Sequence, residues 1–154
     1  MVENLIKLTK EQHPEILEIV DVQVDESLVY GLVKKDEGKE ATVVVYKVNN
    51  KNAEKHTAVT AYWKDNVAVL DIEENGSSRT VKTDYTKTTS DVTVQASFCE
   101  NAINALCGFG GVAACNAACR AIPIIGVLLG FTVCRNLCAS IVGDGCNAAK
   151  EQFC

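Results

Sequence analysis

The first 98 residues of this 154-residue chain lack cysteine altogether, although the whole chain contains eight. All eight lie between Cys99 and Cys154. Such a distribution separates a part that cannot form disulfides from a part that several disulfides could staple. The length suits one or two small domains. We therefore expect two segments of different chemistry within one chain.

Clustered positive charge is also missing. The chain has 15 Lys and Arg against 20 Asp and Glu, which gives a formal net charge of −5. Phosphate binding requires a basic patch, so we expect no nucleic acid as a partner. From Cys99 onward the charges cancel, and the whole net charge belongs to residues 1–98. The charged side chains after Cys99 are Glu100, Arg120, Arg135, Asp144, Lys150 and Glu151.

Long hydrophobic runs are absent as well. Residues 1–10 alternate apolar and charged side chains and contain no twin-arginine pair, whereas a secretory signal needs seven or more consecutive apolar residues. The longest uncharged apolar stretch, Ala121 to Cys134, has fourteen residues, and a membrane-spanning helix needs about 20. We expect neither a conventional export signal nor a single spanning helix.

The residue groups that carry enzymatic chemistry are not found together. The two histidines, His13 and His56, lie far from every cysteine in the sequence. No serine lies in a GxSxG motif, and the glycines at 108–111 lack the spacing of a phosphate-binding loop. We expect no catalytic residues, no cofactor and no metal site, and therefore no enzyme.

Residues 1–85 are expected to form an antiparallel β-sheet domain with one short helix. Thr9 and Gln12 resemble a capping box, and Pro14 limits the helix to about residues 9–19. A period of two then places Val20, Val22 and Val24 on one face. Asp21, Gln23 and Asp25 fall on the other face.

Further β-branched and aromatic runs occupy residues 28–34, 42–48, 57–63, 67–72 and 78–85. The connections are short and rich in turn residues, among which Asn75-Gly76 suits a type I′ hairpin. Short connections favour antiparallel neighbours, so we expect five or six strands. Residues 86–98 are rich in Thr and Ser and resemble a linker.

The cysteines are spaced 8, 8, 4, 15, 4, 8 and 8 residues apart, and this series reads the same in both directions. In an antiparallel helical hairpin, the residue numbers of two facing positions always add up to the same total. Four nested cysteine pairs of this chain meet that condition. The pairs would be Cys99–Cys154, Cys107–Cys146, Cys115–Cys138 and Cys119–Cys134. Another pairing or metal binding is the alternative, although no CxxC motif is present.

Glycines interrupt both arms of this hairpin at mirrored positions, 108–111 and 143–145. We therefore expect four short helices, at residues 99–107, 112–120, 127–142 and 146–153. Alanines at the facing positions would let the two arms approach closely enough for disulfide geometry. The fold class expected is α+β, in which an N-terminal antiparallel sheet precedes a small all-α disulfide-stapled hairpin spanning residues 99–154.

Three segments of this part resemble the cysteine-rich microhalocin peptides of the halocin C-eight type. They are Cys107-Gly-Phe-Gly-Gly-Val-Ala-Ala-Cys-Asn-Ala-Ala-Cys119, the hinge Ile122-Pro-Ile-Ile-Gly-Val-Leu-Leu-Gly-Phe131 and Gly145-Cys-Asn-Ala-Ala-Lys-Glu-Gln-Phe-Cys154. In that family one precursor carries an N-terminal immunity portion and a C-terminal antimicrobial peptide that a protease releases. The archaeal members have more cysteines and a twin-arginine signal.

The resemblance implies a bacteriocin precursor whose C-terminal peptide is secreted. The apolar hinge could form the core of the hairpin itself. It could also insert into a target cell membrane, with the N-terminal domain masking it before cleavage and conferring immunity afterwards. The membrane-contacting residues would be Arg120, Ile122, Ile124, Ile125, Val127, Leu128, Leu129, Phe131 and Arg135.

Two other functions fit the same sequence. One is an intracellular cysteine-rich module that binds metal or performs redox chemistry under the control of the β domain. The other is an extracellular inhibitor of a partner protein.

Overall fold

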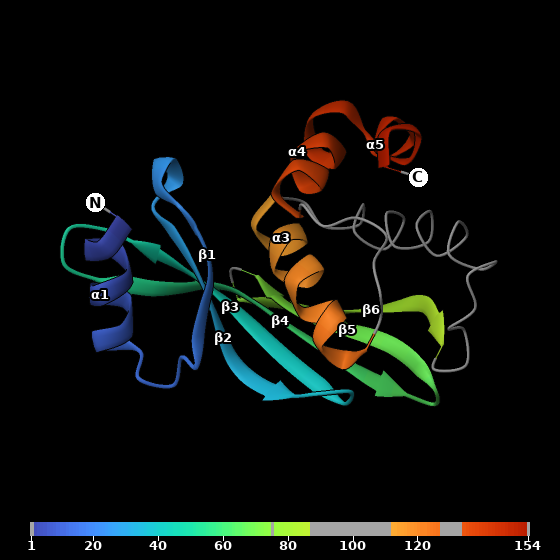
Figure 1. The fold of residues 1–154 in the computed structure, drawn as a ribbon, viewed down its shortest axis with the longest axis horizontal. Helices are drawn as coiled ribbons and strands as arrows, with labels where there is room; N and C mark the ends of the chain where they lie inside the picture. The colour runs from blue at the N-terminus through green and yellow to red at the C-terminus, as the bar shows by residue number, and fades with distance from the viewer. Residues whose placement is uncertain (1, 75, 87–111, 127–133, 154) are drawn as a thin grey trace.

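The computed structural model describes residues 2–74, 76–86, 112–126 and 134–153. A helix precedes six strands, and further helices follow them (Figure 1). The N-terminal elements are α1 (Val2–Gln12), β1 (Glu18–Gln23), η1 (Val24–Glu26), β2 (Leu28–Asp36), β3 (Glu40–Val48), β4 (Ala53–Lys64), β5 (Val67–Glu74) and β6 (Ser77–Thr86). The C-terminal elements are α3 (Val112–Ala121), η3 (Ile122–Ile125), α4 (Cys134–Asp144) and α5 (Cys146–Phe153).

The six strands form one antiparallel sheet in sequence order, from β1 to β6. Each strand pairs with the next because the connections are short. At the turn between β4 and β5, Asp65 and Asn66 both have positive φ, as a two-residue I′ turn requires. The α+β class, the antiparallel sheet and the C-terminal helices predicted from the sequence are confirmed.

The predicted position of the first helix is wrong. α1 ends at Gln12, and the Thr9–Gln12 pair lies at its C-terminal end rather than its start. The Thr9 hydroxyl donates to the carbonyl oxygen of Leu5 at 2.7 Å. Leu5 and Leu8, three residues apart, pack against the sheet and fix the helix further toward the N-terminus.

The predicted alternation along β1 is wrong at Val20. A β-bulge lies between Ile19 and Asp21, so that Ile19 pairs with Gly31 and Asp21 with Tyr30. Val20 packs against one apolar cluster and Val22 against the other, so these two valines do not share a face. The bulge adds one residue to the strand at Val20, whereas Asp21 keeps the register of Val22 and lies on the same face as Tyr30.

The two faces of the sheet have different covers. One face packs against α1 through a cluster that includes Val29, Val44 and Tyr46. The other face, which we call the helix-covered face, packs against the C-terminal helices. Its buried side chains on the sheet are Leu28, Tyr30, Leu32, Ala41, Val43, Val45, Val59, Ala61, Ala68, Leu70 and Ile72.

The C-terminal helices stack away from the sheet. α3 packs on β3, β4 and β5, and α4 packs on α3 and α5. α3 therefore lies between the sheet and α4, as the orange and red helices in Figure 1 show. Its residues 114–119 are all buried, as expected for a helix with neighbours on opposite sides. The predicted helix 99–107 lies outside the described residues, as does the first part of the predicted helix 127–142.

Candidate functional site

The contact between the sheet and the C-terminal helices is a single continuous apolar cluster. It joins the helix-covered face to α3, η3, α4 and α5. Ala114, Ala117, Ala118 and Ala121 are all 0% exposed, and their small side chains let the α3 backbone come close to its neighbours. The cysteine-rich part is thus not separate from the sheet but shares its core.

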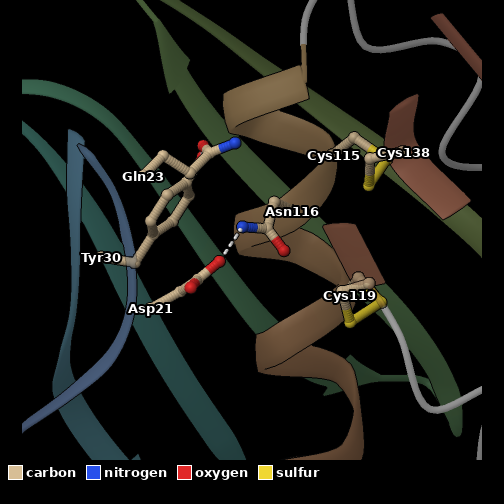
Figure 2. Close-up of a disulfide and its surroundings, with 8 residues drawn as sticks. Asp21, Gln23, Tyr30, Cys115, Asn116, Cys119 and Cys138 are labelled. Carbon is tan, nitrogen blue, oxygen red and sulfur yellow. Dashed lines mark hydrogen bonds between the residues drawn. A yellow bond between two sulfur atoms is a disulfide. The ribbon is translucent and has the colours of Figure 1, made fainter. Parts of the chain in front are cut away.

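Two disulfides join α3 to α4 on the side of α3 away from Asp21 (Figure 2). They are Cys115–Cys138, with a Cα–Cα distance of 5.7 Å, and Cys119–Cys134, with a distance of 5.8 Å. These are the two inner pairs of the nested series. Cys146 is also in a disulfide. The outer pairs of the prediction, Cys107–Cys146 and Cys99–Cys154, lie outside the described residues.

The first part of the apolar hinge packs into the helix-covered face. Ile122 and Ile125 are 0% and 1% exposed, while Ile124 is half-buried and packs against the same cluster. Of the other residues assigned to membrane contact, Val127, Leu128, Leu129 and Phe131 lie outside the described residues, as does the side chain of Arg135.

Two hydrogen bonds from the sheet hold the backbone of this hinge. The indole Nε1 of Trp63 donates to the carbonyl oxygen of Ile125 at 3.0 Å. The backbone N–H of Gly38 donates to the carbonyl oxygen of Ile124 at 3.0 Å. Gly38 lies in the turn between β2 and β3 with φ +77°, a conformation that glycine adopts without strain. Both donors bind main-chain oxygens, so they fix the path of the hinge independently of its side chains.

Side-chain recognition occurs at Asp21 of β1, where Figure 2 shows its carboxylate pointing at Asn116 of α3. Nδ2 of Asn116 donates to Oδ2 of Asp21 at 2.9 Å, and the Arg120 guanidinium lies 3.5 Å from the same oxygen. The Asp21 side chain is only 10% exposed, and Asn116 is fully buried. Opposite charges at a buried contact interact more strongly than exposed ion pairs do.

Neighbouring polar groups complete the surroundings of Asp21. Its Oδ1 accepts from the N–H of Val22 at 2.8 Å, and the hydroxyl of Tyr30 donates to Gln23. Within the described residues, Oδ1 of Asn116 and Nε of Arg120 are buried without a hydrogen-bond partner. An unsatisfied buried polar atom costs free energy. The hydrogen bond from Nδ2 of Asn116 to Asp21 therefore offsets part of the cost of burying this side chain.

The sequence did not single out Asp21, Asn116 or Gly38 as functional residues. Alternation placed Asp21 and Val22 on opposite faces, as the structure has them, but it could not show that α3 covers the face of Asp21. Trp63, at the end of the predicted strand 57–63, is half-buried and also donates a hydrogen bond to the hinge. A single tryptophan at the end of a predicted strand was the one feature of the sequence that could have pointed to this contact.

The described ranges contain no cluster of three or more His, Cys, Asp or Glu suited to a metal ion. In the same parts of the chain, no helix is long and apolar enough to cross a membrane. What the arrangement offers is a contact between the sheet and the C-terminal helices that is apolar at its centre and polar at its edge, where Asp21 meets Asn116 and Arg120.

Comparison with known proteins bears on the whole chain. A family model, Gpos_C8-like, with the description “Putative immunity protein/bacteriocin”, matches residues 1–146. A search of curated proteins found no match, and neither did a search of solved structures.

Proposed function

This chain belongs to the Gpos_C8-like family of immunity protein/bacteriocin chains, and from that membership we propose that it is the precursor of a secreted antimicrobial peptide. The peptide corresponds to the cysteine-rich C-terminal part, and a protease releases it by cutting near residues 86–98. The sheet domain acts as its mask before cleavage and as the immunity partner of the producing cell afterwards.

The burial of Ile122 and Ile125 on the sheet is the observation that carries this proposal. Both side chains belong to the apolar hinge that would enter a membrane. While they are covered by strands β2, β3 and β4, the hinge has no apolar surface at these two positions to offer to lipid. Release from the sheet would expose them and make the peptide active.

Membrane action follows from the chemistry of the freed hinge. Isoleucine side chains enter the boundary between headgroups and acyl chains, and neighbouring arginines keep their charge at the headgroups. Arg120 adjoins the hinge and loses Asp21 as its partner on release. The disulfides between α3 and α4 would keep the peptide folded outside the cell, where thiols oxidise.

The metal or redox module is less well supported. Cys115, Cys119, Cys134 and Cys138 are engaged in disulfides, and these sulfurs cannot be thiolate ligands at the same time.

A leakage assay on the full chain tests the proposal. A site for a sequence-specific protease would be introduced within residues 86–98, and the chain would be added to dye-loaded anionic vesicles before and after cutting. We expect no leakage from the intact chain and leakage after cleavage at dilutions at which the two pieces separate. An uncut control without the introduced site, treated with the same protease, should stay silent. Equal leakage before and after cleavage would contradict masking.

Mass spectrometry of the producing culture tests secretion and processing. We expect a supernatant fragment that begins between residues 86 and 99 and gains about 8 Da on reduction, two hydrogens for each of four disulfides. An uncut chain confined to the cell lysate would contradict the precursor reading.

A further inference from the structure

We propose that Asp21 is the residue by which the immunity domain distinguishes its own peptide from related peptides. The proposal rests on the proposed function, since it assigns the specificity of the same contact. The partner that Asp21 selects is a helix with an amide and a guanidinium four residues apart. In this chain those groups belong to Asn116 and Arg120.

The composition of α3 is the first step of the argument. The helix reads Val-Ala-Ala-Cys-Asn-Ala-Ala-Cys-Arg-Ala, so Asn116 and Arg120 are its only polar side chains apart from the disulfide-bonded cysteines. Residues four apart lie on one face of a helix. Both polar side chains of α3 meet one carboxylate, at 2.9 Å and 3.5 Å.

The other contacts between the sheet and the C-terminal part would allow many different peptides to bind. Trp63 and Gly38 bind backbone oxygens, which every sequence has. Alanine, isoleucine and cystine packing tolerates substitutions that conserve volume. A peptide with the same cysteine spacing and the same apolar hinge would therefore fit these contacts whatever side chains it had at positions 116 and 120.

Asp21 would not tolerate such a change. Its side chain is 10% exposed, so a peptide without donors at these two positions would cover a carboxylate and provide no hydrogen bond to Oδ2. Covering the carboxylate while removing two of its partners disfavours the wrong peptide, which is how binding sites reject close analogues. A peptide with an acidic residue at position 120 would add repulsion.

The pairing of β1 with β2 fixes the position of Asp21. Asp21 pairs with Tyr30 in the same register as Val22 with Val29 and Gln23 with Leu28, which places it on the helix-covered face together with Tyr30. The β-bulge lies on the N-terminal side of Asp21, at Val20, and leaves this register unchanged.

The test uses the full chain with the introduced protease site and an affinity tag on its N-terminus. After cleavage, retention of the C-terminal piece on the tagged piece gives their affinity by dilution. We expect the wild-type pieces to stay bound and Asp21→Asn to weaken binding on the order of 100-fold. Asp25→Asn is the matched control: it changes the same charge at an exposed position of η1 and should bind like wild type.

A double-mutant cycle separates recognition from a merely structural role. Arg120→Gln should weaken binding in the wild-type background and have much less effect in the Asp21→Asn background, because the two changes remove one shared interaction. Additive effects would overturn the assignment, as would an Asp21→Asn affinity equal to that of Asp25→Asn. The charge-exchange variant Asp21→Lys/Arg120→Glu should recover part of the binding that Asp21→Lys loses.

The outcomes distinguish this proposal from the one on which it rests. If the wild-type pieces separate on cleavage, the immunity contact is wrong and the assignment of Asp21 fails with it. If they stay together and every Asp21 variant binds equally well, the immunity contact stands and only the specificity assignment fails. Circular dichroism of each uncut variant identifies any that has not folded.

Discussion

At the scale of single residues, the end of α1 is tied to the sheet by a polar cluster. The His13 ring lies 4.3 Å from that of Tyr46, and its Nε2 donates to the carbonyl oxygen of Ala53 at 2.6 Å. Glu15 lies 3.2 Å from Nδ1 of His13 and accepts from the Tyr46 hydroxyl at 3.3 Å. These contacts connect the segment after α1 to strands β3 and β4.

Glu15 gives this cluster a pH dependence. A hydrogen bond from its own backbone N–H, aided by His13 and Tyr46, holds the pKa of Glu15 below its usual range. A lowered pKa means that the ionised form stabilises the fold. This contribution is complete above the ordinary glutamate pKa of about 4.3 and disappears as the pH falls through the lower folded value.

We therefore expect Glu15→Gln to lower stability near pH 7, where the ionised carboxylate contributes fully, and the difference from wild type to shrink as the pH falls from 5 to 3. Thermal unfolding across this range measures the difference. Glu11→Gln, an exposed carboxylate of α1, serves as the control and should follow the wild-type curve. If Glu15→Gln lost as much stability as the wild type when the pH is lowered, the role assigned to this carboxylate would be contradicted.

Trp63 is the only tryptophan of the chain and donates to the hinge. Trp63→Phe keeps an aromatic ring but leaves the carbonyl oxygen of Ile125 without this donor, so we expect a loss of about 1–2 kcal/mol in unfolding free energy. Urea unfolding followed by circular dichroism measures it. Tyr62→Phe removes a hydrogen bond to Asp71 and should cost less, because that bond does not hold the hinge. Equal losses in the two variants would argue against an anchoring role for Trp63.

At the scale of elements, the two α3–α4 disulfides act on nearly the same loop. Their sequence separations are 15 and 23 residues. Once one bridge closes the loop, the other adds little further restriction to the unfolded chain. Either bridge alone therefore removes most of the conformational entropy that the two remove together from the unfolded chain. In the folded chain they hold the helix pair at two points.

We expect Cys119→Ala/Cys134→Ala and Cys115→Ala/Cys138→Ala to cost about 1 kcal/mol each, and removal of both pairs to cost about 3 kcal/mol. Alanine avoids burying a hydroxyl at these positions, since Cys119 and Cys138 are fully buried. Chemical denaturation of the three variants under oxidising conditions gives the values. If the losses from the two single-pair variants simply summed to that of the four-cysteine variant, the bridges would be independent.

At the scale of the whole molecule, the sheet and the C-terminal helices unfold together. Their buried side chains form one cluster, so each side loses part of its core when the other unfolds. We expect urea transitions followed by Trp63 fluorescence and by far-ultraviolet circular dichroism to coincide. Two separate transitions in the uncut chain would contradict this shared core.

Much of the local structure could be predicted from the sequence. β-branched runs and turn residues indicated the strands, because alternation and turn chemistry are properties of short segments. The symmetric cysteine spacing gave the Cys115–Cys138 and Cys119–Cys134 pairs, because an antiparallel helix pair imposes a constant index sum. The family resemblance agreed with the match to residues 1–146.

Only the tertiary structure decided how these parts meet. Which cover Asp21 meets depends on the pairing of β1 with β2 and on the face of the sheet that α3 packs against, and alternation within β1 contains neither. The burial of Ile122 and Ile125 on the sheet depends on packing between segments more than 50 residues apart, as the Trp63–Ile125 hydrogen bond shows. The sequence therefore determined the elements and two cross-links, while long-range packing decided which surface of the C-terminal part is buried and which residue of the sheet its polar side chains meet.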